Sequence, residues 1–204
     1  MENKKKQVIL VATHIFLNRG ILPVKMTDIA NECGIGVASL YRYFSNKKNI
    51  VIEVATHLWY DLEPLVINLL DVQEFNSKNG YEQLYIMGNI YIDLYINNPN
   101  LLTFINEFDL FIISENITKD ELVEYEKSVV SFYKYFDKAI QKGQKEKVIR
   151  DNINTDIFYL TATHTLLLLC QKLAKPNILI SDDKDKNKEE IKLLIDALLA
   201  YAKI

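Results

Sequence analysis

The chain has 204 residues, of which 49% are hydrophobic and 25% are charged, a composition that is ordinary for a globular protein with a buried core. Its two cysteines, Cys33 and Cys170, are too few for a disulfide framework, which favours a reducing compartment. No apolar run reaches the about 20 residues of a membrane helix, and the N-terminal segment makes a poor cleavable signal. These features exclude a disulfide-stapled or membrane-spanning class and predict a cytoplasmic protein.

The charge is unevenly distributed along the chain, whose net charge is −3. Residues 1–50 contain eight Lys or Arg against three Asp or Glu, a net charge of +5, and residues 51–204 contain 16 against 24, a net charge of −8. A basic head on an acidic body is typical of a small phosphate-binding module carried by a larger domain that does not bind nucleic acid.

Hydrophobic periodicity predicts helices along the whole chain, and the six glycines and four prolines are few enough for long ones. We expect Gly20 to end the first helix and Ser45 or Asn46 to cap a helix that begins near Lys47. A helix without a polar face should be buried all round, as expected for residues 156–174. The fold class is therefore all-α, with helices expected at about 4–19, 26–33, 37–44, 47–70, 81–96, 101–113, 119–143, 156–174 and 189–202.

Residues 26–44 contain two short helices joined by a three-residue turn with glycine, the pattern of a helix-turn-helix. Gly34 can take the left-handed conformation that ends the first helix, and Leu40 and Phe44 should anchor the second helix to the core. The exposed side of that second helix can reach base edges and phosphates. Its residues are Val37, Ala38, Ser39, Tyr41, Arg42 and Tyr43.

On these residues the sequence resembles the TetR family of transcriptional regulators. The resemblance covers roughly the first quarter of the chain, through Ile9, Ala12, Phe16, Gly20, Asp28-Ile29-Ala30, Gly34, Ala38-Ser39-Leu40-Tyr41-Arg42-Tyr43-Phe44 and Lys47. It implies a three-helix DNA-binding domain over residues 1–48 and a helical effector-binding and dimerisation bundle over residues 49–204. The implied function is a DNA-binding repressor.

The resemblance also implies how the head contacts DNA. Bases are contacted from about Val37, Ala38 and Ser39, and phosphates from Tyr41, Tyr43 and Lys47, with Arg42 in either role. Half-buried packing is the alternative role for Tyr41 and Tyr43.

The sequence departs from the family at three positions. Lys25 replaces the usual capping Thr or Ser, so that either Thr27 starts the helix later or Lys25 meets a phosphate itself; a cap is worth about 1 kcal/mol. Gly36 replaces a common serine, and Lys48 replaces a common glutamate and adds positive charge. The predicted DNA-contacting residues are Lys25, Thr27, Val37, Ala38, Ser39, Tyr41, Arg42, Tyr43, Lys47 and Lys48.

The acidic body is expected to form a homodimer, because the resemblance implies a four-helix interface made by the helices at 156–174 and 189–202 of two subunits. A monomer core is the alternative for these helices. The candidate interface residues are Leu166, Leu169, Ile191, Leu194, Ile195 and Leu198. Two heads held one DNA turn apart, about 34–36 Å, would read a palindromic operator.

Aromatic residues crowd the middle of the chain, which contains twelve tyrosines in all. Such residues are more often core than pocket, but so many hydroxyls suit an apolar pocket for a lipophilic or aromatic effector. The candidate lining residues are Trp59, Tyr91, Tyr95, Phe108, Phe111, Tyr133 and Tyr159. Effector binding is expected to shift the helix that begins at Lys47, with a coupling of about 1–3 kcal/mol.

Three other functions compete with this interpretation. An enzyme is disfavoured because His14, His57 and His164 lack metal-ligand spacing and neither cysteine has a nearby base; no catalytic residue, metal or cofactor is expected. A helix-turn-helix scaffold that binds a protein partner remains open, and a salt titration would separate it from a DNA-binding protein. An activator of the same fold also remains open.

Overall fold

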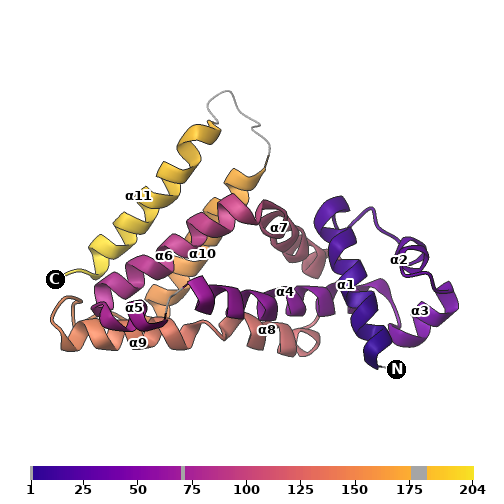
Figure 1. Cartoon of the computed structure of the whole chain (residues 1–204), viewed down its shortest axis with the longest axis horizontal. Helices are drawn as coiled ribbons and strands as arrows, with labels where there is room; N and C mark the ends of the chain where they lie inside the picture. Colours follow the sequence, from indigo (N-terminus) through magenta and orange to yellow (C-terminus); the bar gives the residue numbers. More distant parts are fainter. Residues whose placement is uncertain (1, 70–71, 176–182) are drawn as a thin grey trace. The chain divides into compact units, whose positions relative to one another are not determined.

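The structure, a computed structural model, describes residues 2–69, 72–175 and 183–204. Within these ranges every regular element is a helix, apart from one isolated β-bridge between Ile149 and Lys203. The all-α prediction is therefore confirmed (Figure 1). The helices are α1 (Glu2–Arg19), α2 (Met26–Glu32), α3 (Val37–Tyr43), α4 (Lys47–Leu69), α5 (Val72–Ser77), α6 (Gly80–Asn97), α7 (Pro99–Ser114), the 3-10 turn η1 (Asp120–Leu122), α8 (Val123–Val130), α9 (Tyr133–Lys145), α10 (Thr155–Ala174) and α11 (Lys184–Ala202).

The chain packs into two compact units. The first unit contains Met1–Leu62 and Thr103–Val130, and the second contains Glu63–Leu102 and Ser131–Ile204. Helices α4 and α7 each contribute residues to both units. These packing units are not functional domains, so the expected division at residue 48 stays a prediction.

The core of the first unit joins the N-terminal helices to α7. Phe16 of α1 stacks on Phe104 with ring centroids 6.5 Å apart, and Phe104 stacks in turn on Phe108 at 6.2 Å. All three rings are buried. Aromatic burial of this kind contributes both area and specific ring geometry, so the head packs on residues that lie almost 90 positions later in the sequence.

The second unit is built around α6, which packs against α9, α10 and α11 (Figure 1). Its core combines aliphatic residues of all four helices, including Leu84, Ile140, Leu166 and Ile195. Apolar residues on one face of each helix are what this arrangement requires.

The described part of the chain covers one face of helix α10 and leaves another open. Phe158, Ala162, Leu166 and Cys170 are buried, whereas a second stripe that includes Leu168 lies in solvent, with Leu168 62% exposed. We expected residues 156–174 to be buried on all sides, but the described chain buries a single face of α10. Among the described helices, α10 alone meets length and composition criteria for a membrane span, which core helices of soluble proteins also meet.

The predicted helix of about 25 residues from Lys119 is wrong, because the segment divides into η1, α8 and α9. The break at Ser131–Phe132 falls where the chain passes from the first unit to the second. Helix α8 buries Ser128 in one unit, and α9 buries Ala139 and Ile140 in the other.

The ends of two other predicted segments also differ. Helix α9 continues to Lys145, beyond the expected helix end at about residue 143. Helix α11 begins at Lys184, before the expected start at about residue 189, and the Asp183 carboxylate accepts a hydrogen bond from the Asp185 amide at 3.0 Å. Acidic N-caps of this type satisfy an otherwise unpaired amide; residues 176–182 lie outside the described residues.

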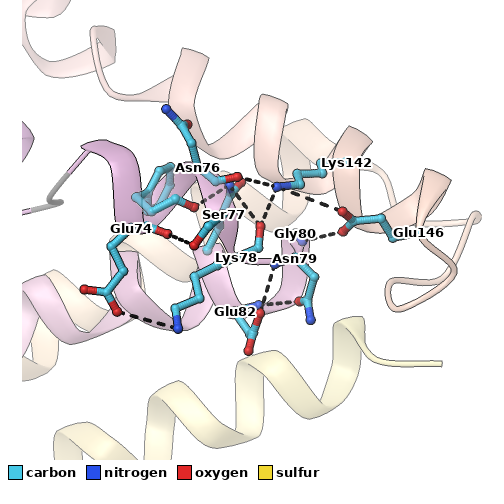
Figure 2. Close-up of polar contacts among 11 residues, drawn as sticks. Glu74, Asn76, Ser77, Lys78, Asn79, Gly80, Glu82, Lys142 and Glu146 are labelled. Carbon is cyan, nitrogen blue, oxygen red and sulfur yellow. Dashed lines mark hydrogen bonds and ion pairs between the residues drawn. The ribbon is translucent and has the colours of Figure 1, made fainter.

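Figure 2 shows how α9 fixes the turn between α5 and α6. The Lys142 ammonium donates to the carbonyls of Asn76, at 2.9 Å, and Lys78. The Glu146 carboxylate accepts from the Gly80 amide at 2.8 Å. A cation thus meets the end of α5 and an anion meets the start of α6, as the helix dipoles favour.

We predict that Gly80→Ala destabilises the protein by about 1–3 kcal/mol or more, since overpacking costs this much even where neighbours can adjust. A Cβ at Gly80 would lie 2.2 Å from the Gly143 nitrogen and 2.3 Å from the Ala139 oxygen, both backbone atoms. Urea unfolding followed by circular dichroism measures the loss. Gly36→Ala is the control, because a Cβ there meets nothing within 4 Å; equal stability of the two variants would contradict the prediction.

Candidate nucleic-acid interface

Helices α2 and α3 form a packed helix-turn-helix. Gly34 has a φ of +63°, as predicted for the end of the first helix, and the Ile35 amide donates to the Ala30 carbonyl at 3.0 Å. Ala30 and Leu40 are fully buried. The turn therefore has the conformation that glycine permits, and α3 is attached to the head through one face.

The opposite face of α3 is open to solvent. Of the residues predicted to contact DNA on this helix, Ala38, Tyr41 and Arg42 are exposed, and Val37, Ser39 and Tyr43 are half-buried. The Arg42 guanidinium donates to the Ser39 hydroxyl at 2.9 Å, one turn earlier on the same side. Hydroxyl and guanidinium groups are those that hydrogen-bond to bases and phosphates.

Helix α2 is capped although Lys25 replaces the usual capping Thr or Ser, and the capping residue was not predicted. The helix begins at Met26, so Thr27 does not delay it. The Asp28 carboxylate accepts from the Lys25 amide at 2.8 Å, which supplies one half of a capping box. The side chains of Lys25 and Thr27 are both exposed beside this cap. The next cap follows the prediction, since Asn46 accepts from the Asn49 amide at 2.9 Å.

The two lysines at the start of α4 are already engaged within the first unit. The Lys47 ammonium donates to the carbonyls of Ile21, at 2.5 Å, and Leu22, at 3.3 Å. Burial lowers the pKa of Lys47. Lys48 forms a 2.5 Å ion pair with Glu121 of η1. A phosphate contact by Lys48 would compete with Glu121, and Lys47 already directs two of its three N–H donors at the loop carbonyls.

Two positions near this surface were missed by sequence reasoning. Lys5 of α1 lies over the ring of Phe44, the residue that ends α3, with its nitrogen 5.3 Å from the ring centroid. Glu107 of α7 binds the loop that leads into α2. Lys4, Lys5 and Lys6 contribute to the positive charge that the sequence shows for residues 1–50. Nothing in the sequence indicated that Glu107 contacts the loop before α2.

The predicted effector residues are divided between the two units. In the first unit, Trp59 donates to the Tyr125 hydroxyl at 3.3 Å, and the Phe108 and Tyr125 rings meet edge-on at 4.8 Å. Burial raises the pKa of Tyr125 to about 12. Phe111 lies in the same core.

The other four candidates belong to the second unit. The Tyr133 and Tyr159 rings meet edge-on at 5.1 Å, and Tyr133 donates to Asp156, which raises the pKa of the phenol to about 12. Burial also raises the pKa of Tyr91. The Tyr95 hydroxyl accepts from Asn187 at 2.8 Å.

The predicted interface residues separate into two groups. Leu166, Ile191 and Ile195 are buried in the core of the second unit, where they hold the subunit itself together. Leu169, Leu194 and Leu198 are only partly buried at the edge of that core.

Comparisons with known proteins agree with this geometry. Residues 8–54 match the family model of bacterial regulatory proteins of the tetR family. A putative transcriptional regulator from Saccharomonospora viridis, solved with choline, has a TM-score of 0.71 at 19% identity, covering 96% of this chain and 97% of that one. The search of curated proteins finds no match.

Two further solved structures are similar over nearly their full length. The ketosteroid regulator KstR2 of Mycobacterium tuberculosis has a TM-score of 0.64 at 16% identity, covering 98% of this chain and 95% of that one. The regulator FadR from Bacillus subtilis, solved with stearoyl-CoA, has a TM-score of 0.66 at 14% identity, covering 96% and 98%. At these identities the likeness is one of fold.

An anchored helix-turn-helix with an exposed second helix, followed by a helical bundle, defines a DNA-binding transcriptional regulator. The match over residues 8–54 identifies the N-terminal part of this chain as the domain that the tetR family of bacterial regulatory proteins shares.

We predict that the Lys48–Glu121 pair persists far into acid. Hydrogen bonds from Lys48 and then Thr118 lower the pKa of Glu121 to about 2 from 4.5. A depressed folded-state pKa gives a stabilisation that is complete above about pH 4.5 and is lost as the pH falls towards 2. Carboxyl NMR titration measures this pKa. In Lys48→Met it should rise yet stay below 4.5, because Thr118 remains; an unchanged value would contradict the pairing.

Proposed function

We propose that the protein is a cytoplasmic homodimeric repressor that leaves a palindromic operator when a small lipophilic or aromatic effector binds. The observation that carries the proposal is the outer face of α3, where Tyr41 and Arg42 are exposed and Ser39 is half-buried, on a helix whose inner face is anchored by Leu40 and Phe44. A short helix held in this way fits the DNA major groove.

The proposed DNA contacts follow from position on this face. Val37, Ala38 and Ser39 lie at the start of α3, where small side chains allow close approach to base edges. Arg42 reads a base or binds a phosphate, and Tyr41 and Tyr43 bind phosphates, as do Lys25 and Thr27 at the start of α2. Lys48 joins them when it leaves Glu121, whereas the ammonium of Lys47 stays with the loop carbonyls.

The proposed dimer uses α10 and α11. Leu193, Ala197 and Ala200 are exposed at the spacing of one helical face of α11, with Leu193 71% exposed. On α10 the corresponding stripe contains Ile157, Leu160, His164 and Leu168. Leu169, Leu194 and Leu198 flank these stripes. Apolar and small residues on exposed helix faces suit helix-to-helix packing between subunits.

The proposed effector site lies among the aromatic residues of the second unit. The core there contains the amide nitrogen of Gln171, which is buried and has no hydrogen-bond partner among the described residues. Such a donor costs free energy unless an acceptor meets it, and a lipophilic effector with a carbonyl or carboxylate oxygen would supply one. The similar structures solved with choline and stearoyl-CoA support a ligand role for this fold.

Selection of bound sites from random duplex DNA tests the proposed function. The full-length protein should select a palindrome, and its affinity should fall steeply with salt as counterions are released. Selection of no common sequence would instead favour the scaffold that binds a protein partner.

We predict that Arg42→Ala weakens binding to the selected operator by about 1–3 kcal/mol and relaxes specificity at one base pair per half-site. Arg42 is exposed, so the variant should fold normally. Fluorescence anisotropy with operator duplexes substituted at each position measures both effects. Lys138→Ala removes one exposed positive charge from α9 and is the control. If the two variants bind alike, Arg42 does not read the operator.

A further inference from the structure

The loop between α1 and α2 is held by two charged side chains that come from outside these helices. The Glu107 carboxylate of α7 accepts a hydrogen bond from the Ile21 amide at 2.6 Å. The Lys47 ammonium of α4 donates to the carbonyl of the same residue at 2.5 Å and to that of Leu22 at 3.3 Å. One residue of backbone is thus bound by an anion on its N–H side and by a cation on its C=O side.

Glycine at position 20 allows this close approach. Gly20 has a φ of +79°, and a Cβ there would lie 2.9 Å from both carboxylate oxygens of Glu107. Any other residue would be strained by the backbone and would push the carboxylate away. The end of α1 is therefore shaped to receive the side chain of Glu107.

The clamped loop leads directly into the helix-turn-helix. Ile21 and Val24 are buried, and α2 begins at Met26. Because the loop is short and packed, its position determines where α2 and then α3 lie. Hydrogen bonds to charged groups are stronger than neutral ones, so this clamp restrains the loop more firmly than packing alone.

Helix α7 carries the anionic half of the clamp. It buries Leu102 in the second unit and Phe104 and Phe108 in the first, with Glu107 between these two phenylalanines. A continuous helix cannot move one of these residues without moving the others. The position of Glu107 is therefore fixed by the packing of α7.

We propose that Glu107 and Lys47 are positioning residues for operator binding, which set the orientation of α2 and α3 through the α1–α2 loop and do not touch DNA with their side chains. The proposal rests on the proposed DNA-binding function. It replaces the phosphate contact that the family resemblance implies for Lys47.

Three variants test the proposal, each measured by fluorescence anisotropy with the selected operator over a salt series. Glu107→Ala and Lys47→Met should weaken binding about tenfold or more, because each removes charge-assisted hydrogen bonds from the loop. The slope of log affinity against log salt should not change, since no phosphate contact is lost. Glu107→Gln retains a carbonyl oxygen for the Ile21 amide and should restore most of the affinity.

Hydrogen exchange at the Ile21 amide gives a readout that needs no DNA. Exchange should accelerate in Glu107→Ala and remain slow in Glu107→Gln. Glu63→Gln is the matched control, because it removes the negative charge from the 2.7 Å pair with Lys134 in the second unit; it should change neither Ile21 exchange nor operator affinity.

Each other outcome overturns part or all of the proposal. Wild-type affinity in both Glu107→Ala and Lys47→Met would overturn it entirely. A salt slope shallower by about one in Lys47→Met would make Lys47 a phosphate contact. If the wild-type protein selects no operator, the proposed function fails, and unchanged Ile21 exchange in Glu107→Ala would still separately overturn the clamp.

Discussion

The seven-residue helix α3 must be fixed on one face and free on the other, and the rest of the head follows from that requirement. A helix this short is not stable alone in water. Leu40 and Phe44 therefore anchor it to the core, and Gly34 sets its angle to α2. In the same unit, Phe104 and Phe108 of α7 continue the aromatic stack that begins at Phe16 of α1, so the core of this unit depends on residues far along the chain.

The partners of the basic residues in positions 1–50 bear on DNA binding more directly than the net charge does. Of the eight basic residues in positions 1–50, Lys47 and Lys48 are engaged by loop carbonyls and by Glu121. The Glu121 carboxylate offsets the charge of Lys48, whereas the neutral carbonyls orient Lys47 without cancelling its charge. In the proposed function, operator affinity therefore depends on the geometry of α3 as well as on the total positive charge.

Local patterns were predictable from the sequence, and distant partners were not. Gly20, Gly34 and the Asn46 cap were predicted because each depends on neighbouring residues alone. The partners of Lys47 and Lys48 could not be inferred, since Glu121 lies 73 positions after Lys48. The break at Ser131 was missed because periodicity does not show that the two halves of a segment pack into different cores. The sequence analysis expected residues 156–174 to be buried on all sides and to contribute to an interface, but an apolar helix does not show which of its faces its own chain covers.

The position of the proposed effector site limits how a signal from it can reach the proposed DNA-contacting face. Phe108 and Phe111 belong to the core of the first unit. We therefore place the proposed effector site in the second unit, among residues such as Tyr91 and Tyr159. Only α4 and α7 contain described residues of both units. Each of these two helices supplies one half of the clamp on Ile21. A coupling of about 1–3 kcal/mol suffices for regulation, and breaking one charge-assisted hydrogen bond at this loop is a change of that size.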